Sequence, residues 1–164
     1  MSLKRFLTDI QELKSLPRSG WLRVGLENPE SVAAHSWGVA TICLLLCPQG
    51  LDREKVLEIA LLHDLAEVIV GDITPQDGLN EADKHQKELE AFKNLVQDLP
   101  ERERLLALFQ EYQENTTPEA SFVHIADKLD MYFQANHYED KYKKDLSEFK
   151  LSAFKYLQGM ELVD

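Results

Sequence analysis

The sequence predicts an all-α fold, and three observations support this prediction. Nearly every segment carries apolar residues at the three- and four-residue spacing that is typical of amphipathic helices. Proline, glycine and other turn-forming residues separate these segments. No convincing pair of strands is visible in the pattern. We expect one domain over residues 1–164, because a chain of 164 residues can bury a sizeable core without disulfides or metals as staples.

Two helices are expected in the first third of the chain, with a loop between them. Residues 3–15 place five apolar side chains on one stripe of a helix. The segment 16–30 contains two prolines and two glycines, so we expect a loop. Ser31 is a suitable N-cap for a helix over residues 31–47, which Pro48 ends.

The middle of the chain predicts two more helices. Asp52 is a suitable cap for a helix over residues 53–70, and Gly71 follows its last residue. The turn-rich segment 71–78 is expected to be a loop. A helix at about 80–98 follows and ends near a proline.

The last third of the chain completes the set. Pro100 lies near the first turn of a helix over residues 101–115. Thr117 opens a long helix that runs to about residue 138. A final helix is expected over roughly 143–157. The expected architecture is therefore a set of helices around one core.

Composition restricts the classes of partner. The net charge is −11, and such a surface repels a polyanion, so we expect no nucleic-acid polymer as a ligand. A small anion remains possible where a metal or a few cations concentrate positive charge. The longest apolar runs are too short to span a membrane, and Asp9 and Glu12 interrupt the first apolar segment, unlike a signal peptide. We therefore expect a cytoplasmic protein, with Cys43 and Cys47 as buried thiols.

The segment ALLHDLAEVIVGD, residues 60–72, contains ionisable side chains in an otherwise apolar run. On one continuous helix, His63 and Glu67 share a face, and Asp64 lies about 100° around from His63. Buried charges must be paired or bound to a metal, which makes this segment a candidate metal site. A core histidine or an exposed acidic face is the alternative interpretation.

Two other expected helices carry a polar residue of the ligand type within an apolar pattern. His35 interrupts the segment VAAHSWG, and Asp127 interrupts HIADKLD. Three helices with one such position each can meet in a bundle and bring the side chains together. The candidate metal ligands are His35, His63, Asp64 and Asp127.

These motifs resemble those of the HD-domain metal-dependent phosphohydrolases, in which a histidine, a His-Asp pair and an aspartate follow in this order. The segments PESVAAHSWGVA, LLHDLAEVIVGDITP and ADKLDMYFQA resemble the 5′-deoxynucleotidase branch, and the similarity runs from about Leu16 to Asp140. The resemblance implies an HD-domain helical bundle with a single metal site in its core. It also implies a homodimer that removes the 5′-phosphate from deoxynucleoside monophosphates.

The donor set limits the chemistry. Two imidazoles and two carboxylates without a thiolate argue against a structural zinc site. Mn, Co, Fe, Mg, Ni, Cu and Zn all accept such ligands, so we expect one divalent metal per chain without assigning it. A metal at this site would activate a water for attack on a phosphomonoester and neutralise phosphoryl charge.

Two acidic residues beyond the ligand set are candidate catalytic residues. Glu67 is expected to orient the attacking water or accept its proton, and the resemblance supports this role. A surface or salt-bridged glutamate is the alternative. Asp72 is expected to protonate or position the leaving 5′-oxygen, or to contact the sugar. Its alternative role is that of an ordinary turn residue.

Substrate contacts are expected from the early loop and from the segment after Asp72. Arg18 is the candidate phosphate clamp and Arg23 is its rival, and the remaining alternative is that neither binds the phosphate. The resembling family has an arginine followed by a tryptophan here, whereas two residues separate Arg18 from Trp21 in this chain. Trp21 either flanks the sugar or belongs to the core. The candidates for a wall against a ribose 2′-hydroxyl are Trp21, Ile73 and Thr74.

Some features favour less specific interpretations. His85 and His124 fall in the interval where some HD proteins hold a second metal, but His85 lies in a charged segment that predicts an exposed helix. Lys84 is expected on the same solvated face. Two alternative functions remain: an HD-fold phosphohydrolase for another small phosphorylated metabolite, and a metal- or nucleotide-binding module without turnover. Glu67 and Asp72 argue against the second, because a pure binding module needs neither acid.

Overall fold

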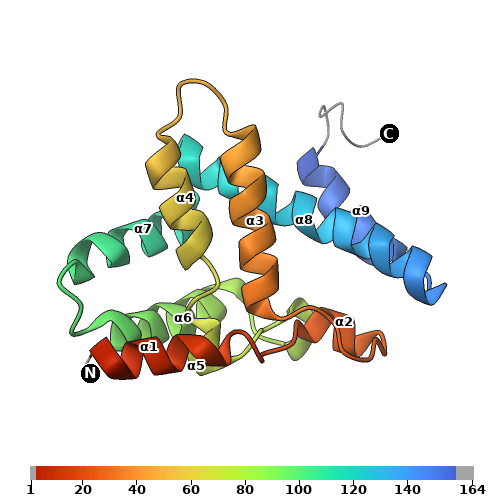
Figure 1. The fold of residues 1–164 in the computed structure, drawn as a ribbon, viewed down its shortest axis with the longest axis horizontal. Coiled ribbons are helices and arrows are strands. Elements are labelled where there is room, and N and C mark those ends of the chain that lie inside the picture. The colour runs from red at the N-terminus through yellow and green to blue at the C-terminus, as the bar shows by residue number, and fades with distance from the viewer. Residues whose placement is uncertain (1–2, 158–164) are drawn as a thin grey trace.

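The computed structural model describes residues 3–157, which fold entirely into helices and connecting loops (Figure 1). The elements in chain order are α1 (Leu3–Glu12), α2 (Ser19–Arg23), α3 (Val32–Leu46), α4 (Arg53–Leu62), α5 (Glu67–Val70), the 3₁₀ helix η1 (Pro75–Asp77), α6 (Glu81–Val96), α7 (Arg102–Glu114), α8 (Pro118–Tyr142) and α9 (Ser147–Leu157). Among these residues there is no strand, and one isolated antiparallel bridge joins Pro17 to Ser31. The predicted all-α fold class is therefore confirmed.

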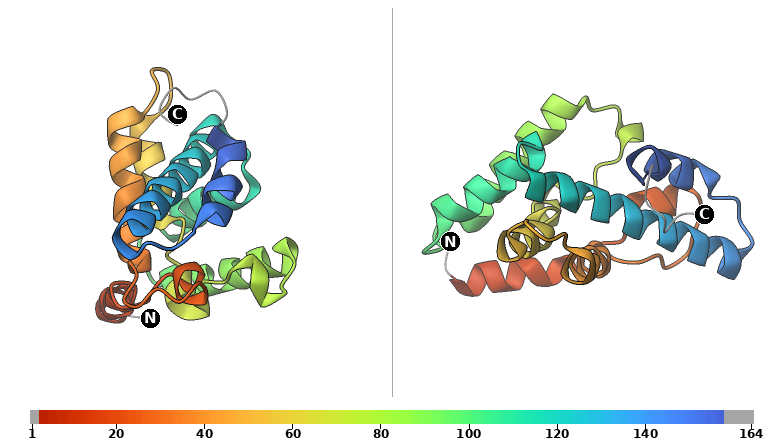
Figure 2. Two further views of the ribbon diagram at one scale, coloured as in Figure 1. Left: turned by 90° about the vertical axis from the view of Figure 1, so that its right-hand side faces the viewer. Right: turned by 90° about the horizontal axis from the view of Figure 1, so that it is seen from above.

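The long helix α8 forms the axis of the molecule. Helices α3 and α4 stand side by side and pack against α8, and α9 runs along its C-terminal half (Figures 1 and 2). Helices α6 and α7 pack against each other, with α5 against α6 and α1 against α5. This arrangement brings α3, α8 and the segment between α4 and α5 together at the centre.

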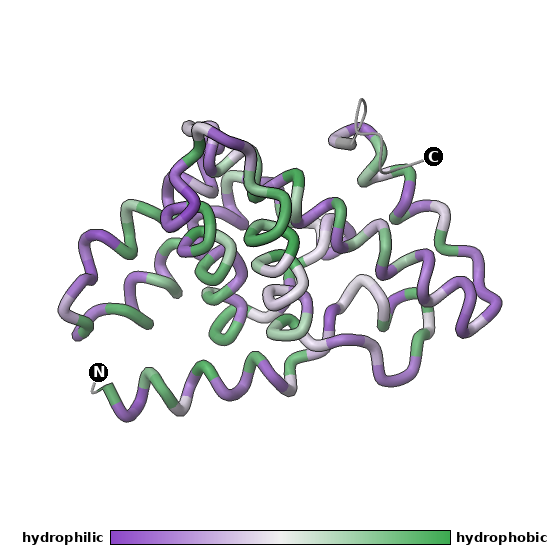
Figure 3. Tube along the Cα trace, turned by 45° about the horizontal axis from the view of Figure 1, so that its top comes forward, coloured by the Kyte–Doolittle hydropathy of each residue, from purple (hydrophilic) through white to green (hydrophobic). Residues whose placement is uncertain are grey.

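The core lies where α3, α4 and α8 meet. Apolar stretches concentrate along α3 and α4, whereas hydrophilic stretches run along α8 beyond them and through the outer loops (Figure 3). The buried side chains shared by these three helices include Val39, Ile59 and Val123. A second cluster joins α6 to α7, where the rings of Phe92 and Phe109 stack with centroids 4.2 Å apart. Apolar burial of this kind is the main stabilising contribution to the fold.

The helix starts predicted from side-chain capping are confirmed. The side chain of Ser31 accepts a hydrogen bond from the Ala34 N–H at the start of α3. Asp52 caps α4, and Thr117 caps α8, each by accepting from the N–H three residues later. Each cap provides an acceptor for an N–H group that has no partner within the helix.

Two expected boundaries are wrong. The predicted loop over 16–30 contains the short helix α2, because Trp21 is buried against Tyr138 and Phe149 and this packing holds the segment in place. The predicted helix over 53–70 is interrupted by turns at residues 63–66. There the ring of His63 donates from Nδ1 to the Ala60 carbonyl at 2.7 Å. In a continuing helix this carbonyl would accept from a backbone N–H of the next turn, so the side chain competes with the helix.

Other ends of the helices differ by a few residues. Helix α8 continues to Tyr142 and ends where Lys143 adopts a left-handed conformation, since neither glycine nor proline stops it earlier. Helix α9 begins at Ser147 rather than at 143, because Asp145 accepts hydrogen bonds from Ser147. Cys43 is buried and Cys47 is half-buried, and both are free thiols. Within residues 3–157, no helix has both the length and the apolar character needed to cross a membrane.

Candidate metal centre and substrate pocket

Four predicted ligands meet at the centre of the molecule. His35 comes from α3, His63 and Asp64 from the turns between α4 and α5, and Asp127 from α8. The break after α4 matters here, because it is the irregular segment that carries His63 and Asp64 into the space between the other two helices. The structure brings the residues that the sequence pattern singled out into one region, although the expected continuous helix was wrong.

The donor atoms of these residues lie close together. His35 Nε2 is 3.2 Å from Asp127 Oδ1 and 3.6 Å from Asp64 Oδ2. His63 Nε2 is 3.2 Å from the same Asp64 oxygen. Two ligands at about 2.1 Å from one ion and at right angles to each other are about 3.0 Å apart. The ligand atoms of His35, His63 and Asp64 lie within 4.8 Å of one another, a spacing that suits a single divalent ion, and Asp127 joins them through its contact with His35.

Both imidazoles are oriented by the ring nitrogen that faces away from the centre. His63 Nδ1 donates to the Ala60 carbonyl, and His35 Nδ1 donates to Asp130 Oδ2 at 2.7 Å. A carbonyl and a carboxylate only accept, so in each ring Nδ1 carries the hydrogen. Both Nε2 atoms are buried and have no hydrogen-bond partner in the described part of the chain. A metal ion satisfies such atoms, and the site therefore fits one.

The two carboxylates of the centre are held in the ionised form. Burial alone would raise the pKa of Asp127, but the nearby charges of Lys128 and His35 outweigh it, and the pKa lies well below its usual range. The pKa of Asp64 is lowered in the same way, against burial, by His63 and Arg18. Arg18 Nη1 is 3.3 Å from Asp64 Oδ2, and Lys128 Nζ is 2.9 Å from Asp127 Oδ2. Ionised carboxylates are ready metal ligands.

The pKa of His35 is raised above that of a free imidazole, to about 9. Burial and the charge of Arg18 lower this pKa, but the carboxylates of Asp127 and Asp130 outweigh them. An incoming cation thus competes with a proton for Nε2. Metal binding at this centre is therefore coupled to proton release.

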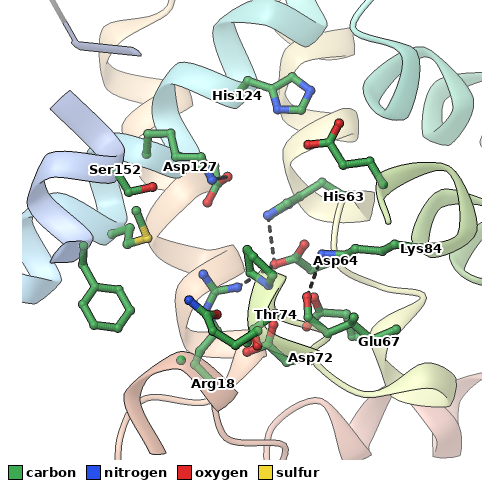
Figure 4. Close-up of a pocket in the computed structure, with 18 of the residues that line it drawn as sticks. Arg18, His63, Asp64, Glu67, Asp72, Thr74, Lys84, His124, Asp127 and Ser152 are labelled. Carbon is green, nitrogen blue, oxygen red and sulfur yellow. Dashed lines mark hydrogen bonds and ion pairs between the residues drawn. The ribbon is translucent and has the colours of Figure 1, made fainter. Parts of the chain in front are cut away.

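Glu67 and Asp72 have different environments. Glu67 is buried, its Oε2 has no hydrogen-bond partner among the described residues, and its pKa is raised well above the ordinary value by burial and by the charges of Asp64 and Asp72. Asp72 is half-buried and accepts a hydrogen bond from the Ser19 N–H at 2.6 Å. Figure 4 places both on the side of the centre where Arg18 and Thr74 lie.

A pocket of about 560 Å³ opens over these residues. Its floor includes His63, Asp64, Glu67 and Asp127 (Figure 4). Its walls come from the segment around α2, the loop after α5, and helices α6 to α9. The volume is within the range of small-molecule sites. Ionisable groups with shifted pKa values at the base of a cavity are typical of a catalytic site.

The structure separates the two candidate phosphate clamps. Arg18 is mostly buried beside the centre, and although burial would lower its pKa, Asp64 and Asp72 raise it above the ordinary value. Arg23 lies at the rim and forms an ion pair with Glu148 at 2.6 Å. Of the two, Arg18 is the guanidinium near the metal centre, whereas Arg23 is engaged by a neighbouring helix.

The three expected sugar-wall residues all border the pocket. Trp21 is only 2% exposed, and its Nε1 donates to Glu30 Oε1 at 2.9 Å. It is therefore largely a core residue with one edge toward the cavity. Ile73 and Thr74 lie in the loop after α5, and Thr74 is held by hydrogen bonds to Asp77.

Several residues at the site were not anticipated. Lys84 was expected on a solvated face but borders the pocket, where its Nζ donates to the Ile73 carbonyl at 2.8 Å. His85 is exposed as expected, yet it also borders the pocket. The contact between Asp130 and His35 was missed, although Asp130 follows the ligand Asp127 by three residues, a spacing that predicts a shared helix face. His124 Nε2 donates to the Tyr112 carbonyl, and the rings of these two residues stack.

Comparisons with known proteins place this chain in a family. A model of the HD domain matches residues 10–163. A 5′-deoxynucleotidase, hdd1, of Schizosaccharomyces pombe is 40% identical over 157 residues, which cover 91% of this chain and 79% of that protein.

Two solved structures have similar folds. The PH0347 protein from Pyrococcus horikoshii OT3 has a TM-score of 0.81 and 40% identity, with 95% of this chain and 94% of that chain covered. A predicted metal-dependent phosphohydrolase from Magnetospirillum magnetotacticum MS-1 has a TM-score of 0.73 and 27% identity, with 94% and 79% covered.

Proposed function

This chain belongs to the HD domain family, and we propose that it is a metal-dependent phosphohydrolase that removes the 5′-phosphate from deoxynucleoside monophosphates. The family expected from the sequence is confirmed. The substrate class is supported by the similarity to a 5′-deoxynucleotidase over most of both chains. The class of reaction is also supported by the solved structure from Magnetospirillum magnetotacticum, which has a similar fold and is described as a predicted metal-dependent phosphohydrolase.

The observation that carries the proposal is the pair of buried, unpartnered Nε2 atoms of His35 and His63 beside two ionised carboxylates. Burying such polar atoms without partners costs free energy, which a bound cation removes. We assign His35, His63, Asp64 and Asp127 as the ligands of one divalent metal per chain. When bound, a divalent metal lowers the pKa of a coordinated water and neutralises charge on the phosphoryl group.

The side chains around the pocket bind and orient the phosphate. Arg18 is assigned as the clamp, because its fork of N–H donors matches two phosphate oxygens and its position beside Asp64 brings it next to the reacting group. Lys128, which is bonded to Asp127, adds positive charge. These cations allow a protein of net charge −11 to accept a dianionic substrate.

Proton transfer is assigned to the two acids outside the ligand set. Glu67 accepts the proton of the attacking water, because burial raises its pKa toward the range in which a carboxylate acts as an effective base. The water oxygen forms a bond to phosphorus while the bond from phosphorus to the 5′-oxygen breaks. Asp72 positions or protonates that leaving oxygen. The products are a deoxynucleoside and inorganic phosphate.

Discrimination against ribonucleotides is assigned to the wall formed by Trp21, Ile73 and Thr74. Lys84 supports this wall, because its bond to the Ile73 carbonyl fixes the loop at the position where Ile73 borders the cavity. A tight wall excludes an additional hydroxyl by crowding it or by leaving it without a hydrogen-bond partner.

An assay of phosphate release tests the proposal. The protein is incubated with deoxynucleoside and ribonucleoside monophosphates and with each of several divalent metals. Release from the deoxy series supports the proposed substrate class. Equal release from both series assigns the protein to another phosphohydrolase specificity, and absence of release despite bound metal indicates a binding module.

We also propose that the protein forms a homodimer through the outer face of α3. Trp37 and Leu45 are 72% and 73% exposed, and Leu44 beside them is 48% exposed. Leu44 and Leu45 follow Trp37 by seven and eight residues, so the three side chains lie on one stripe of the helix. Exposed apolar patches of this kind often mark interfaces. Light scattering after size exclusion tests this assignment: Leu45→Glu dissociates the dimer, whereas a monomeric parent protein contradicts it.

A cytoplasmic location completes the proposal. It is supported by the two free thiols, Cys43 and Cys47, because unpaired cysteines are typical of reducing compartments. Cell fractionation with an antibody against the protein tests it.

A further inference from the structure

Asp130 is linked to the candidate metal centre through His35. Its Oδ2 lies 2.7 Å from His35 Nδ1, on the side of the ring opposite to the other ligands. His35 is completely buried, so this contact is shielded from water. Asp130 follows Asp127 by three residues on α8, so one face of this helix delivers both a ligand and the group that holds a second ligand.

Gly38 makes room for this carboxylate. A Cβ atom at position 38 would lie 2.1 Å from Asp130 Oδ1, far inside contact distance. Gly38 lies in the interior of α3, three residues after His35, where glycine weakens a helix relative to alanine. The close approach of Asp130 accounts for a glycine at this otherwise unfavourable position.

The other acid nearby is already engaged. Glu30, His35 and Asp130 have potential ligand atoms within 4.8 Å of one another. However, Glu30 accepts a hydrogen bond from Trp21, and its backbone N–H donates to the Tyr138 hydroxyl. Asp130 is therefore the acid that holds Nδ1 of the His35 ring.

We propose that Asp130, seated against Gly38, is a positioning residue that holds His35 with Nε2 directed at the remaining ligands. The inference rests on the metal site of the proposed function. A carboxylate behind a histidine fixes the orientation of the ring and makes it a better electron donor to a metal. Asp130 itself touches neither metal nor substrate.

Four variants of the full-length protein test the proposal: Asp130→Ala, Gly38→Ala, the double variant Asp130→Ala/Gly38→Ala, and Asp140→Ala as a control at an exposed position of the same helix. The probe is Co²⁺ alone. Its dissociation constant is measured by competition with a chelator, its visible spectrum reports the ligand geometry, and the melting temperature of the metal-free protein reports folding.

Asp130→Ala is expected to weaken Co²⁺ binding about 10–100-fold, as is typical for loss of a group behind a metal ligand. Gly38→Ala should weaken binding to a similar extent although the carboxylate is still present, because the new methyl group displaces it. In the double variant no carboxylate remains to be displaced, so Gly38→Ala should add no further loss. Both single variants should alter the Co²⁺ spectrum, whereas Asp140→Ala should leave affinity and spectrum unchanged.

Two results overturn the proposal. One is wild-type affinity and spectrum in folded Gly38→Ala protein. The other is a double variant whose losses are the product of those of the two single variants. Failure of the parent protein to bind Co²⁺ would instead refute the metal site, and this inference with it, which distinguishes the two failures.

Discussion

Asp72 accepts a hydrogen bond from the backbone N–H of Ser19 at 2.6 Å, and this bond joins the loop after α5 to the start of α2. Arg18 directly precedes Ser19, so the same contact fixes the guanidinium beside Asp64. Asp72 therefore has two tasks in our account, one at the leaving oxygen and one in holding Arg18.

These two tasks of Asp72 are separable. Asp72→Ala is expected to lower the free energy of unfolding by about 1.5–3 kcal/mol, the contribution of a hydrogen bond to a charged group, and to raise KM because Arg18 loses its anchor. Asp72→Asn retains an acceptor, so its KM should stay near that of the parent while kcat falls. Urea unfolding and steady-state kinetics measure both effects. A kcat for Asp72→Asn equal to that of the parent would remove Asp72 from proton transfer.

Glu67 is expected to act on the water and not on the metal. Glu67→Gln should leave the metal content unchanged and lower kcat about 10²–10⁴-fold, since general base catalysis contributes this much. The variant removes a buried carboxylate whose pKa is already raised, so folding should not suffer. Elemental analysis and phosphate release from the same sample test the prediction. Unchanged turnover would show that another group accepts the proton.

Metal affinity should depend on pH through His35. The pKa of this ring is raised to about 9 without metal, so below that pH a proton occupies Nε2 and competes with the cation. Affinity should therefore increase from about pH 7 to about pH 9, and binding at about pH 7 should release protons into a weak buffer. Calorimetry in buffers of different ionisation enthalpy measures this release. Binding that is independent of pH over this range would contradict the assignment of His35.

Trp21 should contribute to stability through its indole N–H. Trp21→Phe keeps an aromatic ring but leaves Glu30 without this donor, and we expect the free energy of unfolding to fall by about 1–3 kcal/mol. Leu151→Ala is the control, because Leu151 is 72% exposed and lies outside the proposed dimer face, and a surface change of this kind costs less than about 0.5 kcal/mol. Equal stabilities of the two variants would show that the contact with Glu30 contributes little.

Local signals in the sequence were sufficient for most of the fold. The capping residues Ser31, Asp52 and Thr117 identified three helix starts, because a cap is a contact between residues three apart. Helix α2 and the break after α4 were not predictable in this way. The first depends on Trp21 packing against distant residues, and the second on a side chain that competes for a backbone carbonyl.

The candidate site shows the same limit. His35, His63, Asp64 and Asp127 stood out because each interrupts an apolar helical pattern, and the structure brings them together. Lys84 did not stand out in the sequence, because its neighbours in the chain are charged. Only the folding of the loop after Asp72 brings it to the pocket. Asp130 follows the proposed ligand Asp127 by three residues, but its contact with His35 depends on the space that Gly38 leaves on another helix.

The central claim is that His35, His63, Asp64 and Asp127 hold one divalent cation. The most direct measurement is the metal content of purified protein, determined for the parent and for an alanine variant of each of the four residues. We expect about one equivalent in the parent and a strong loss in every variant that remains folded. A parent protein that retains no metal, or variants that retain it undiminished, would contradict the account.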